Sequence, residues 1–522
     1  MRGAVAAGHE ITAQAGTRVL AEGGNAVDAC IAAAFVSWVA ESPLTGPGAG
    51  GFMLVRRVRE RSSRLLDFFV AAPGLGRTGK PGGEMDATDI DFEGGDTTQR
   101  FLIGTASCAV PGTVAGLAAA HRTYATWPWH ELVEPAIELA RAGVVLTKAQ
   151  AFLHALLDSI LRHTAEGRRV YGKRDARLVA GERLVLQDLA ETLTAIATEG
   201  PDVFYRGHLA TAMAGHLEDH GGAVTPRDLA AYRVIRRRPI AVSYRGLRFE
   251  SNPPPSSGGV LIGYGLRLLD RLGTLGEPGS ADELARLVEV LREQSRARDS
   301  RFTTELHRGG LGRRLLADDA IDAAVLRVQQ SLRAPAEAAS AGGTTHISVM
   351  DGEGNAASLS ASIGAGSGVV VPGTGIHLNN MLGEHDLHPG GRPPKAGSRL
   401  TSMMSPTIVS SGDVPRLVLG SAGSVRLRGA VMQVIVNVAG HGLTVRDAIE
   451  RPRVHVDEPH VHCEGGNDPA ALDELVRRGY DVVRWRRRNL FFGGVAGVER
   501  RVDGTLAAAG DPRRGGHGIV VH

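Results

Sequence analysis

The 522-residue sequence lacks the marks of several large protein classes. Its three cysteines, Cys30, Cys108 and Cys463, are odd in number and far apart, which argues against a disulfide framework and against zinc-binding spacing. The longest apolar stretch, ACIAAAFVSWVA, is too short to cross a bilayer. The net charge of +3 is small for this length, so neither nucleic acid nor a membrane is expected as a partner.

Aromatic residues are also scarce, at 4%, and the N-terminus has no apolar secretory region. We therefore expect a cytoplasmic protein. The strongest basic cluster, RWRRRN at 484–489, has no stacking aromatics spread around it, so a solvated face is expected there. Hydrophobic residues at 43% and charged residues at 22% are typical of a globular protein with a sizeable core.

Two motifs that suggest cofactors are discounted. GPGAGG at 46–51 matches the dinucleotide fingerprint GxGxxG, but a predicted helix precedes it and a predicted strand follows, the reverse of what such a site needs. His385 and His388 lie in a Pro/Gly-rich stretch without further ligands nearby. No metal and no cofactor are expected.

The order of predicted elements favours the α+β class. Helical patterns dominate the first part, including 11–25, the almost wholly apolar 26–40, 131–145 and 282–302, with one strand predicted at 50–58. A small, polar stretch at 331–343 predicts an exposed loop. Strand patterns follow it, at 345–351, 356–363, 402–410, 416–424 and 490–500. Helices first and strands later, without regular βαβ alternation, indicate α+β layers and not a doubly wound sheet.

The stretch GGTTHISVMDGEGNAASLSASIG, from Gly342 to Gly364, predicts a β-hairpin. If the turn is Asp351–Asn355, Met350 faces Ala356 and Thr344 falls opposite Ser362. Directly opposed side chains in an antiparallel pair lie about 5 Å apart. A slip of one residue would destroy this pairing.

A threonine hydroxyl needs a base before it can act as a nucleophile. No GxSxG motif is present, and no motif places a His–Asp pair beside Thr344. Cleavage of the Gly343–Thr344 bond would supply a base, the new α-amino group, whose reference pKa of about 7.7–8.0 leaves a neutral fraction near pH 7. From these residues alone, a plain hairpin remains the simpler explanation.

A set of short motifs, in order along nearly the whole chain, favours the threonine nucleophile over the plain hairpin. These motifs are GGNAVDA (23–29), GGFML (50–54), AVPGTVAGL (109–117), PAIELARAG (135–143), DLAAY (228–232), PPPSSGG (253–259), TTHISV (344–349), LNN (378–380), SMMSPTIV (402–409) and DPR (511–513). Through them the sequence resembles the γ-glutamyltransferase family of N-terminal-nucleophile hydrolases.

The resemblance implies a four-layer αββα sandwich and autocleavage into two associated chains. The cut would fall between Gly343 and Thr344, giving a large chain of residues 1–343 and a small chain of residues 344–522 that together form one domain. Thr344 would be the nucleophile, supported by Ser362. The turn GSAGS would supply the oxyanion-binding N–H groups, from Gly423 and Ser424.

The resemblance also implies where substrate binds, and several of these positions depart from the family pattern. Ser402 matches a donor-binding serine, but Met403 replaces the second one. Phe69 stands where glutathione-using members carry an arginine that pairs with the donor carboxylate. The remaining candidates are Gly364 in place of an asparagine, Met381 in place of a polar or acidic residue, Glu384 in place of an aspartate, and Arg399, for which replacement carboxylate binding and a structural role are both open.

We therefore expect a threonine hydrolase or acyltransferase that cleaves an amide-like donor through an acyl-enzyme, with a donor other than plain glutathione. Its partners would be a small-molecule acyl donor and water or an amine acceptor, and its two chains would form a heterodimer. One alternative is a hydrolase of a natural-product pathway, such as an acylase or a C–C bond hydrolase. Another is a non-catalytic scaffold, which would stay uncut.

Overall fold

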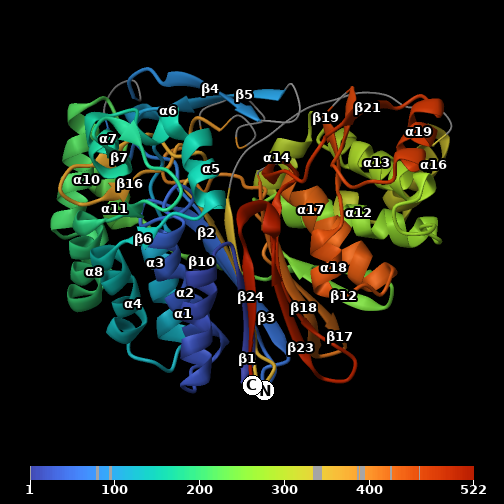
Figure 1. Cartoon of the computed structure of the whole chain (residues 1–522), viewed down its shortest axis with the longest axis horizontal. Coiled ribbons are helices and arrows are strands. Elements are labelled where there is room, and N and C mark those ends of the chain that lie inside the picture. Colours follow the sequence, from blue (N-terminus) through green and yellow to red (C-terminus); the bar gives the residue numbers. More distant parts are fainter. Residues whose placement is uncertain are drawn as a thin grey trace.

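Two β-sheets pack face to face between two layers of helices. The computed structural model describes residues 2–77, 82–92, 97–332, 344–384, 387, 394–423, 426–457 and 459–522. Figure 1 shows the layers edge on, with helices on the left and right and the strands running down the middle. Strands β13 and β14 of the first sheet pack on β18 and β22 of the second. The expected αββα sandwich is confirmed.

Within the described residues the first sheet has seven antiparallel strands. In spatial order they are β10 (Ile235–Arg237), β3 (Ser62–Phe68), β2 (Gly50–Arg57), β14 (Ala356–Ser362), β13 (Thr345–Asp351), β1 (Gly3–Ala7) and β24 (His517–Val521). The second sheet has six there, in the order β11 (Ile240–Tyr244), β12 (Leu247–Ser251), β17 (Thr407–Ser411), β18 (Val414–Ala422), β22 (Gly494–Arg500) and β23 (Leu506–Gly510).

The two helical layers come from different parts of the chain. The main helices on the first sheet's side are α1 (Glu10–Ala21), α2 (Ala26–Ala40), α3 (Thr113–Tyr124), α4 (Trp129–Ala142) and α8 (Gln187–Glu199). Those on the second sheet's side are α12 (Gly258–Leu272), α13 (Ala281–Arg296), α16 (Asp318–Ser331), α17 (Arg426–Ile435) and α18 (Val445–Glu450).

Smaller elements complete the molecule. A hairpin of β4 (Asp86–Phe92) and β5 (Thr97–Ile103) lies across the top of Figure 1, above α5. The other helices include α5 (Lys148–Leu156), α6 (Asp158–Leu161), α7 (Ala165–Tyr171), α9 (Asp202–Tyr205), α10 (His208–Asp219), α11 (Pro226–Ala231), α14 (Phe302–Arg308), α15 (Leu311–Leu315) and α19 (Pro469–Arg477). The short strands are β6 (Val144–Val145), β7 (Gly172–Lys173), β8 (Ala176–Arg177), β9 (Arg183–Leu184), β15 (Val370–Val371), β16 (Ile376–His377), β19 (Val454–Asp457), β20 (His460–Cys463) and β21 (Asp481–Arg484).

The first sheet interleaves strands from distant parts of the sequence. Strand β1, near the N-terminus, pairs with β13 on one side and with the C-terminal strand β24 on the other. Strand β14 pairs with β13 and with β2. Both chain ends therefore lie together at the lower end of the sheets in Figure 1.

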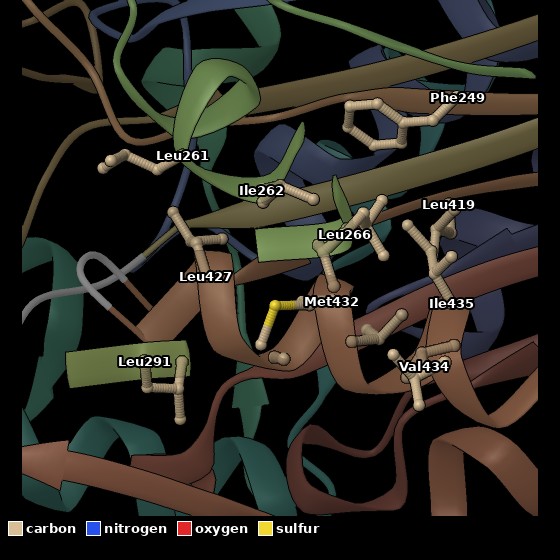
Figure 2. Packing of buried hydrophobic residues seen from close by; sticks show 14 of the residues in the cluster. Phe249, Leu261, Ile262, Leu266, Leu291, Leu419, Leu427, Met432, Val434 and Ile435 are labelled. Carbon is tan, nitrogen blue, oxygen red and sulfur yellow. The ribbon is translucent and has the colours of Figure 1, made fainter. Parts of the chain in front are cut away.

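Strand β13 divides its side chains between the two faces of its sheet. Ile347 and Val349 pack in the core beneath the α1–α2 layer, whereas Met350 packs in the core toward the second sheet. Figure 2 shows part of that second core, in which α17 side chains such as Met432 and Ile435 meet Leu266 of α12 and Leu419 of β18. The alternation follows from the period of two in a strand.

Several predicted elements are confirmed, among them 26–40 as α2, 50–58 as β2 and the strands of the hairpin. Asn25 begins α2 with a reciprocal capping box, in which its side chain accepts from the Asp28 N–H at 3.1 Å and Asp28 accepts from the Asn25 N–H at 2.9 Å. This explains the GGNAVDA motif as a helix start.

Two predictions about the order of elements were wrong. The N-terminal part is not only helical, because β1 and β3 join β2 in the first sheet. Strand β1 is buried on both faces and so has no polar alternation that would mark it in the sequence. The strand predicted at 402–410 begins only at Thr407, since Ser402–Met404 lie against the PPPSSGG segment through bonds from Ser256 and Ser257.

The packing in Figure 2 predicts a large cost for shortening Leu266. This side chain is fully buried, so Leu266→Ala should lower the free energy of unfolding by about 2–5 kcal/mol. Leu326→Ala on α16 is the matched control, because Leu326 is 60% exposed and its loss should change stability by no more than about 0.5 kcal/mol. Urea unfolding followed by circular dichroism measures both. Equal effects would contradict this account of the core.

Candidate active site

The β13–β14 hairpin places Thr344 opposite Ser362. The pairing extends from Met350 opposite Ala356 to Thr345 opposite Ala361, which is the register expected from the sequence. Thr344 precedes the first residue of β13 and Ser362 is the last residue of β14, so they are the next pair in this register. Both are buried, and both line the same pocket.

The backbone at the head of β13 is anchored from two sides. Arg514 donates a hydrogen bond from Nη1 to the carbonyl oxygen of Thr344. The Thr345 hydroxyl donates to Glu41, whose other carboxylate oxygen accepts from the Thr12 hydroxyl at 2.9 Å. Burial lowers the pKa of the Arg514 guanidinium, and the neighbouring carboxylates of Glu41 and Asp511 oppose that shift. Neither Glu41 nor Arg514 was singled out from the sequence.

The chain after Ser362 turns tightly around the pocket. The Ser362 Oγ accepts a hydrogen bond from the Gly364 N–H at 2.8 Å. Gly364 has φ +73°, and a Cβ there would lie 2.1 Å from Asn380 Oδ1 and 3.1 Å from Glu384 Oε1. Any side chain at this position would therefore displace Asn380, so the local packing requires glycine here.

A pocket with about 320 Å³ of empty space surrounds these groups. Six of the seven predicted substrate-binding residues line it together with Thr344 and Ser362. They are Phe69, Gly364, Met381, Glu384, Ser402 and Met403. Three apolar residues that the sequence analysis did not identify also line it, namely Leu387, Met404 and Leu427. Nothing in the sequence distinguished these three from ordinary core residues.

Glu384 is the acidic residue among the described residues that line this pocket. Its side chain is almost fully buried, and its Oε1 accepts from the Ala365 N–H at 3.2 Å. The same N–H donates to Asn380 Oδ1 at 2.9 Å, which fixes the turn on which Glu384 rests. A buried carboxylate in such a place suits a cationic ligand group, such as an ammonium.

The opposite wall is held by the PPPSSGG segment. The hydroxyls of Ser256 and Ser257 donate to the carbonyl oxygen of Ser402 at 2.9 and 3.1 Å. Ser257 also donates to the Met403 sulfur at 2.8 Å. The Ser402 Oγ accepts from the Met404 N–H at 3.0 Å. The PPPSSGG motif therefore positions the pocket wall.

Phe69 gives the pocket an apolar face at the position where the resemblance implies an arginine in glutathione-using members. Its ring stacks on Phe52 with the centroids 5.5 Å apart and the planes 16° from parallel. The side chain is 1% exposed. With Met381, Met403 and Met404 it makes most of the wall apolar, so bidentate recognition of a carboxylate by an arginine at position 69 is absent.

Of the two roles left open for Arg399, the contacts match the structural one. Its guanidinium lies 3.2 Å from Asp67 Oδ1 and donates to the carbonyl oxygens of Phe69 and Arg233. It also stacks over the Tyr232 ring at 4.8 Å. Arg399 is not part of the described lining of the Thr344 pocket, and its contacts support the structural role that the sequence analysis left open.

The predicted oxyanion turn is described only in part. Gly423 follows β18 with φ +128° and lines a second pocket that also includes Gly364. The second pocket adjoins the first at Gly364. Ser424 and Gly343, the other predicted members of the catalytic and cleavage sets, lie outside the described residues.

The motifs discounted as cofactor sites have structural explanations where they are described. GPGAGG covers the end of the turn after α2 and the first two residues of β2, and a Cβ at Gly48 would come within 2.3 Å of the His377 carbonyl oxygen. His385 and His388 lie outside the described residues. Among the described residues, no group of three His, Cys, Asp or Glu side chains is placed to hold a metal ion. No described helix is long and apolar enough to cross a bilayer.

The chain is similar to known proteins over nearly its whole length. A family model described as gamma-glutamyltranspeptidase matches residues 12–521. The "Glutathione hydrolase proenzyme" of Escherichia coli is 32% identical over 540 residues, covering 98% of this chain and 90% of the relative. The "Acylase ACY 1 proenzyme" of Pseudomonas sp. strain SE83 is 32% identical over 538 residues, covering 100% and 94%.

A solved structure of similar shape covers the whole chain. The crystal structure of cephalosporin acylase from Bacillus halodurans superposes with a TM-score of 0.86 at 26% identity, covering 100% of this chain and 96% of that one. The comparisons therefore include both glutathione hydrolases and acylases.

His346, beside the candidate nucleophile, points between the sheets. Its ring nitrogens lie 2.8 Å from Ser360 Oγ and 2.9 Å from Ser348 Oγ. Burial lowers its pKa from 6.5 to about 3, so the ring is neutral near pH 7. Because both ring nitrogens contact serine hydroxyls and the lowered pKa makes the ring a weak base, His346 acts in packing and not as the base for Thr344.

This burial predicts a pH-dependent stability. Between pH 3 and 6.5 the unfolded state binds a proton at His346 that the folded state does not bind. The free energy of unfolding is therefore highest above pH 6.5 and falls as the pH is lowered. His346→Gln should flatten the slope of the unfolding free energy near pH 5 by about 1.4 kcal/mol per pH unit. Urea unfolding at pH 4.5 to 7 measures it, with His130→Gln on the exposed surface as the control. An unchanged slope in His346→Gln would contradict the assignment.

Proposed function

The chain belongs to the gamma-glutamyltranspeptidase family, and from this membership we propose that Thr344 is the nucleophile of an autoprocessed hydrolase or acyltransferase. It is an N-terminal-nucleophile hydrolase by family. The observation that carries the proposal is that Thr344, Ser362 and Glu384 line one pocket, although they lie on separate segments. The proenzyme names of the relatives support the same view.

Processing would proceed by attack of the Thr344 hydroxyl on the carbonyl carbon of Gly343. The peptide C–N bond breaks as the ester C–O bond forms, and the threonine nitrogen takes the hydroxyl proton. Water then hydrolyses the ester, leaving a carboxylate on Gly343 and a free α-amino group on Thr344. Arg514 fixes the Thr344 carbonyl during these steps, which keeps the new terminus at the head of β13.

In turnover, the free α-amino group takes the proton from Thr344 Oγ as this oxygen attacks the donor carbonyl. The leaving amine receives that proton when the acyl-enzyme ester forms. Water or an amine acceptor then attacks the ester and restores the threonine hydroxyl. Ser362 would hold the threonine oxygen in position, and backbone N–H groups of the turn at Gly423 would stabilise the oxyanion.

The two processed chains would remain associated. Strand β1 belongs to the segment before Thr344, and both of its neighbours, β13 and β24, belong to the segment after it. Strand β14 likewise pairs with β2 of the first segment. Separating the chains would break backbone ladders on both sides of β1 and expose core, so a heterodimer is expected.

The donor proposed here keeps an amino group and is more apolar than the glutamyl group of glutathione. Glu384 remains to bind an ammonium, whereas Phe69 and Met403 replace polar groups expected in glutathione-using members. The relatives named as acylases support an acylase-type substrate, including one from a natural-product pathway, as the second candidate.

Autoprocessing is tested by intact mass under denaturing conditions. Wild-type protein should give two chains that meet between Gly343 and Thr344, and Thr344→Ala should remain one chain because it lacks the attacking hydroxyl. Thr344→Ser is the matched control, since it retains a hydroxyl and should still be cut. A wild-type chain that stays intact on long incubation would favour the scaffold alternative.

Donor selection is tested by restoring the family's polar groups. The variant Phe69→Arg/Met403→Ser should raise kcat/KM for glutathione relative to wild type by about tenfold or more, because a charge-assisted bidentate contact becomes available. Met404→Ser adds a hydroxyl to the same wall at a position that does not match the family's paired serines, and should give no such gain. Thermal melting checks that all variants fold. No gain in the double variant would contradict the assignment of position 69.

A further inference from the structure

A groove rich in arginine lies at the β10 edge of the first sheet, with about 730 Å³ of empty space. Tyr124, at the C-terminal end of α3, forms part of its wall, and Glu60 is the acidic residue of its described lining. The described linings of this groove and of the Thr344 pocket share no residue. Four arginines line the groove, namely Arg64 of β3, Arg236 and Arg237 of β10, and Arg238 directly after β10.

The strand register brings three of these arginines to one face of the sheet. Arg236 lies opposite Leu66 of β3, and Leu66 packs in the core beneath the α1–α2 layer. Because side chains alternate along a strand, Arg64, two residues before Leu66, shares this face. Arg238 is the next residue in the register and falls opposite Arg64. Like charges that oppose each other across two strands lower the stability of a sheet.

The fourth arginine and the acidic residue of the groove are each paired. Arg237 donates from Nε to Asp67 Oδ2 at 2.7 Å, and Asp67 is fully buried. The Glu60 carboxylate pairs with Arg57 of β2, with the nitrogen and oxygen 3.2 Å apart. Neither carboxylate is therefore left to neutralise another arginine of the groove.

The three arginines on the shared face have neutral partners. Arg64 donates to the Ser63 carbonyl oxygen at 3.0 Å, and Arg236 donates to the Thr123 hydroxyl at 2.9 Å. Within the described part of the chain, neither these two nor Arg238 lies within ion-pair distance of an acidic side chain. The groove thus has an excess of positive charge that the described residues do not balance.

These charges act on one point of the groove, the Tyr124 hydroxyl. Burial raises the pKa of Tyr124, and the charge of Arg236 is the largest effect that opposes the rise. Glu60 adds to the rise, while Arg64 and Arg57 oppose it. Since Arg236 and Arg64 affect the same phenol from different strands, their guanidinium groups converge on the same part of the groove.

A second hollow adjoins the arginine groove at Tyr124, with about 660 Å³ of empty space. Its two arginines, Arg57 and Arg59, are paired with Glu60 and Glu353 at 3.2 and 3.6 Å. The rest of its described lining is uncharged. An anion is therefore expected in the arginine groove, and the second hollow has room for an uncharged group attached to it.

We propose that the arginine groove binds a diphosphate group, either free or at the end of a small organic molecule. A diphosphate carries about three negative charges near pH 7, because its end phosphate alone carries about 1.5–2. These charges match the guanidinium groups of Arg64, Arg236 and Arg238, which can each bind two phosphate oxygens. The bound anion would also remove the repulsion between Arg64 and Arg238. This site goes beyond the proposed function, which concerns the Thr344 pocket.

The first test is titration calorimetry of the full chain with inorganic pyrophosphate, without magnesium, at pH 7.5 and constant ionic strength. Wild-type protein should bind pyrophosphate about tenfold more tightly than orthophosphate or citrate. Citrate has a similar charge, but its three carboxylates are spread over a carbon chain. General attraction to a positive surface would give equal affinities for pyrophosphate and citrate, and equal affinities would overturn the proposal.

The second test removes two arginines of the groove. Arg236→Gln/Arg238→Gln should weaken pyrophosphate binding by about a hundredfold. The matched control is Arg486→Gln/Arg487→Gln, which removes two exposed arginines from the RWRRRN cluster and should bind as wild type does. Pyrophosphate should raise the Tm of wild type and control but not that of the groove variant, and melting without ligand shows that all three fold. Equal binding by the two folded variants would overturn the proposal.

Adenosine diphosphate distinguishes the two sources of the diphosphate group. Tighter binding of adenosine diphosphate than of pyrophosphate assigns the site to an organic diphosphate, and the reverse order assigns it to free pyrophosphate. Folded wild-type protein that binds neither would overturn the proposal. The measurement needs neither cleavage nor turnover, so its outcome does not depend on the role of Thr344.

Discussion

The pairing of β13 on both sides is the constraint on which the site depends. Thr344 directly precedes the first residue of β13, so the position of this strand sets the position of Thr344. Its position comes from β14 and β1, which hold the strand in register, and from Arg514, which binds its carbonyl. A slip of one residue would turn Thr344 to the other face of the sheet, toward Glu41 and the α1–α2 layer. The buried packing of Ile347 and Met350 on opposite faces makes such a slip costly.

Around Thr344, some residues of the family motifs support the fold, and others line the pocket. Several motifs that mark the family prove to be structural. Asn379 binds Gly48 and Ala109 by hydrogen bonds, and Asp228 accepts from the Gly74 and Leu75 N–H groups. The pocket wall, by contrast, carries Phe69 and Met403, where the resemblance implies departures from the family pattern. The framework contacts pair buried polar groups that a changed residue would leave unpaired, whereas Phe69 and Met403 face the cavity.

Much of the hairpin and of α2 was predictable, because the relevant signals are local. The turn DGEGN fixes the hairpin register, and Asn25 with Asp28 caps α2. Strand β1 was missed because burial on both faces removes its alternation. The role of Arg399 could not be decided from the sequence, since its partners Asp67 and Arg233 come from other segments. Leu387, Met404 and Leu427 carry no chemical signal, and only the fold brings them to the pocket.

The placement of β1 between β13 and β24 has a consequence for the life of the molecule. Before any cut, the strands on either side of Thr344 belong to one chain, and their assembly is unimolecular. After a cut, the same assembly would require two chains to meet, so refolding would become bimolecular and dependent on concentration. A cut molecule that unfolds would no longer have the covalent link between the two chains that was present when it first folded. Its working lifetime would be set by the rate of unfolding and not by an equilibrium with the unfolded state.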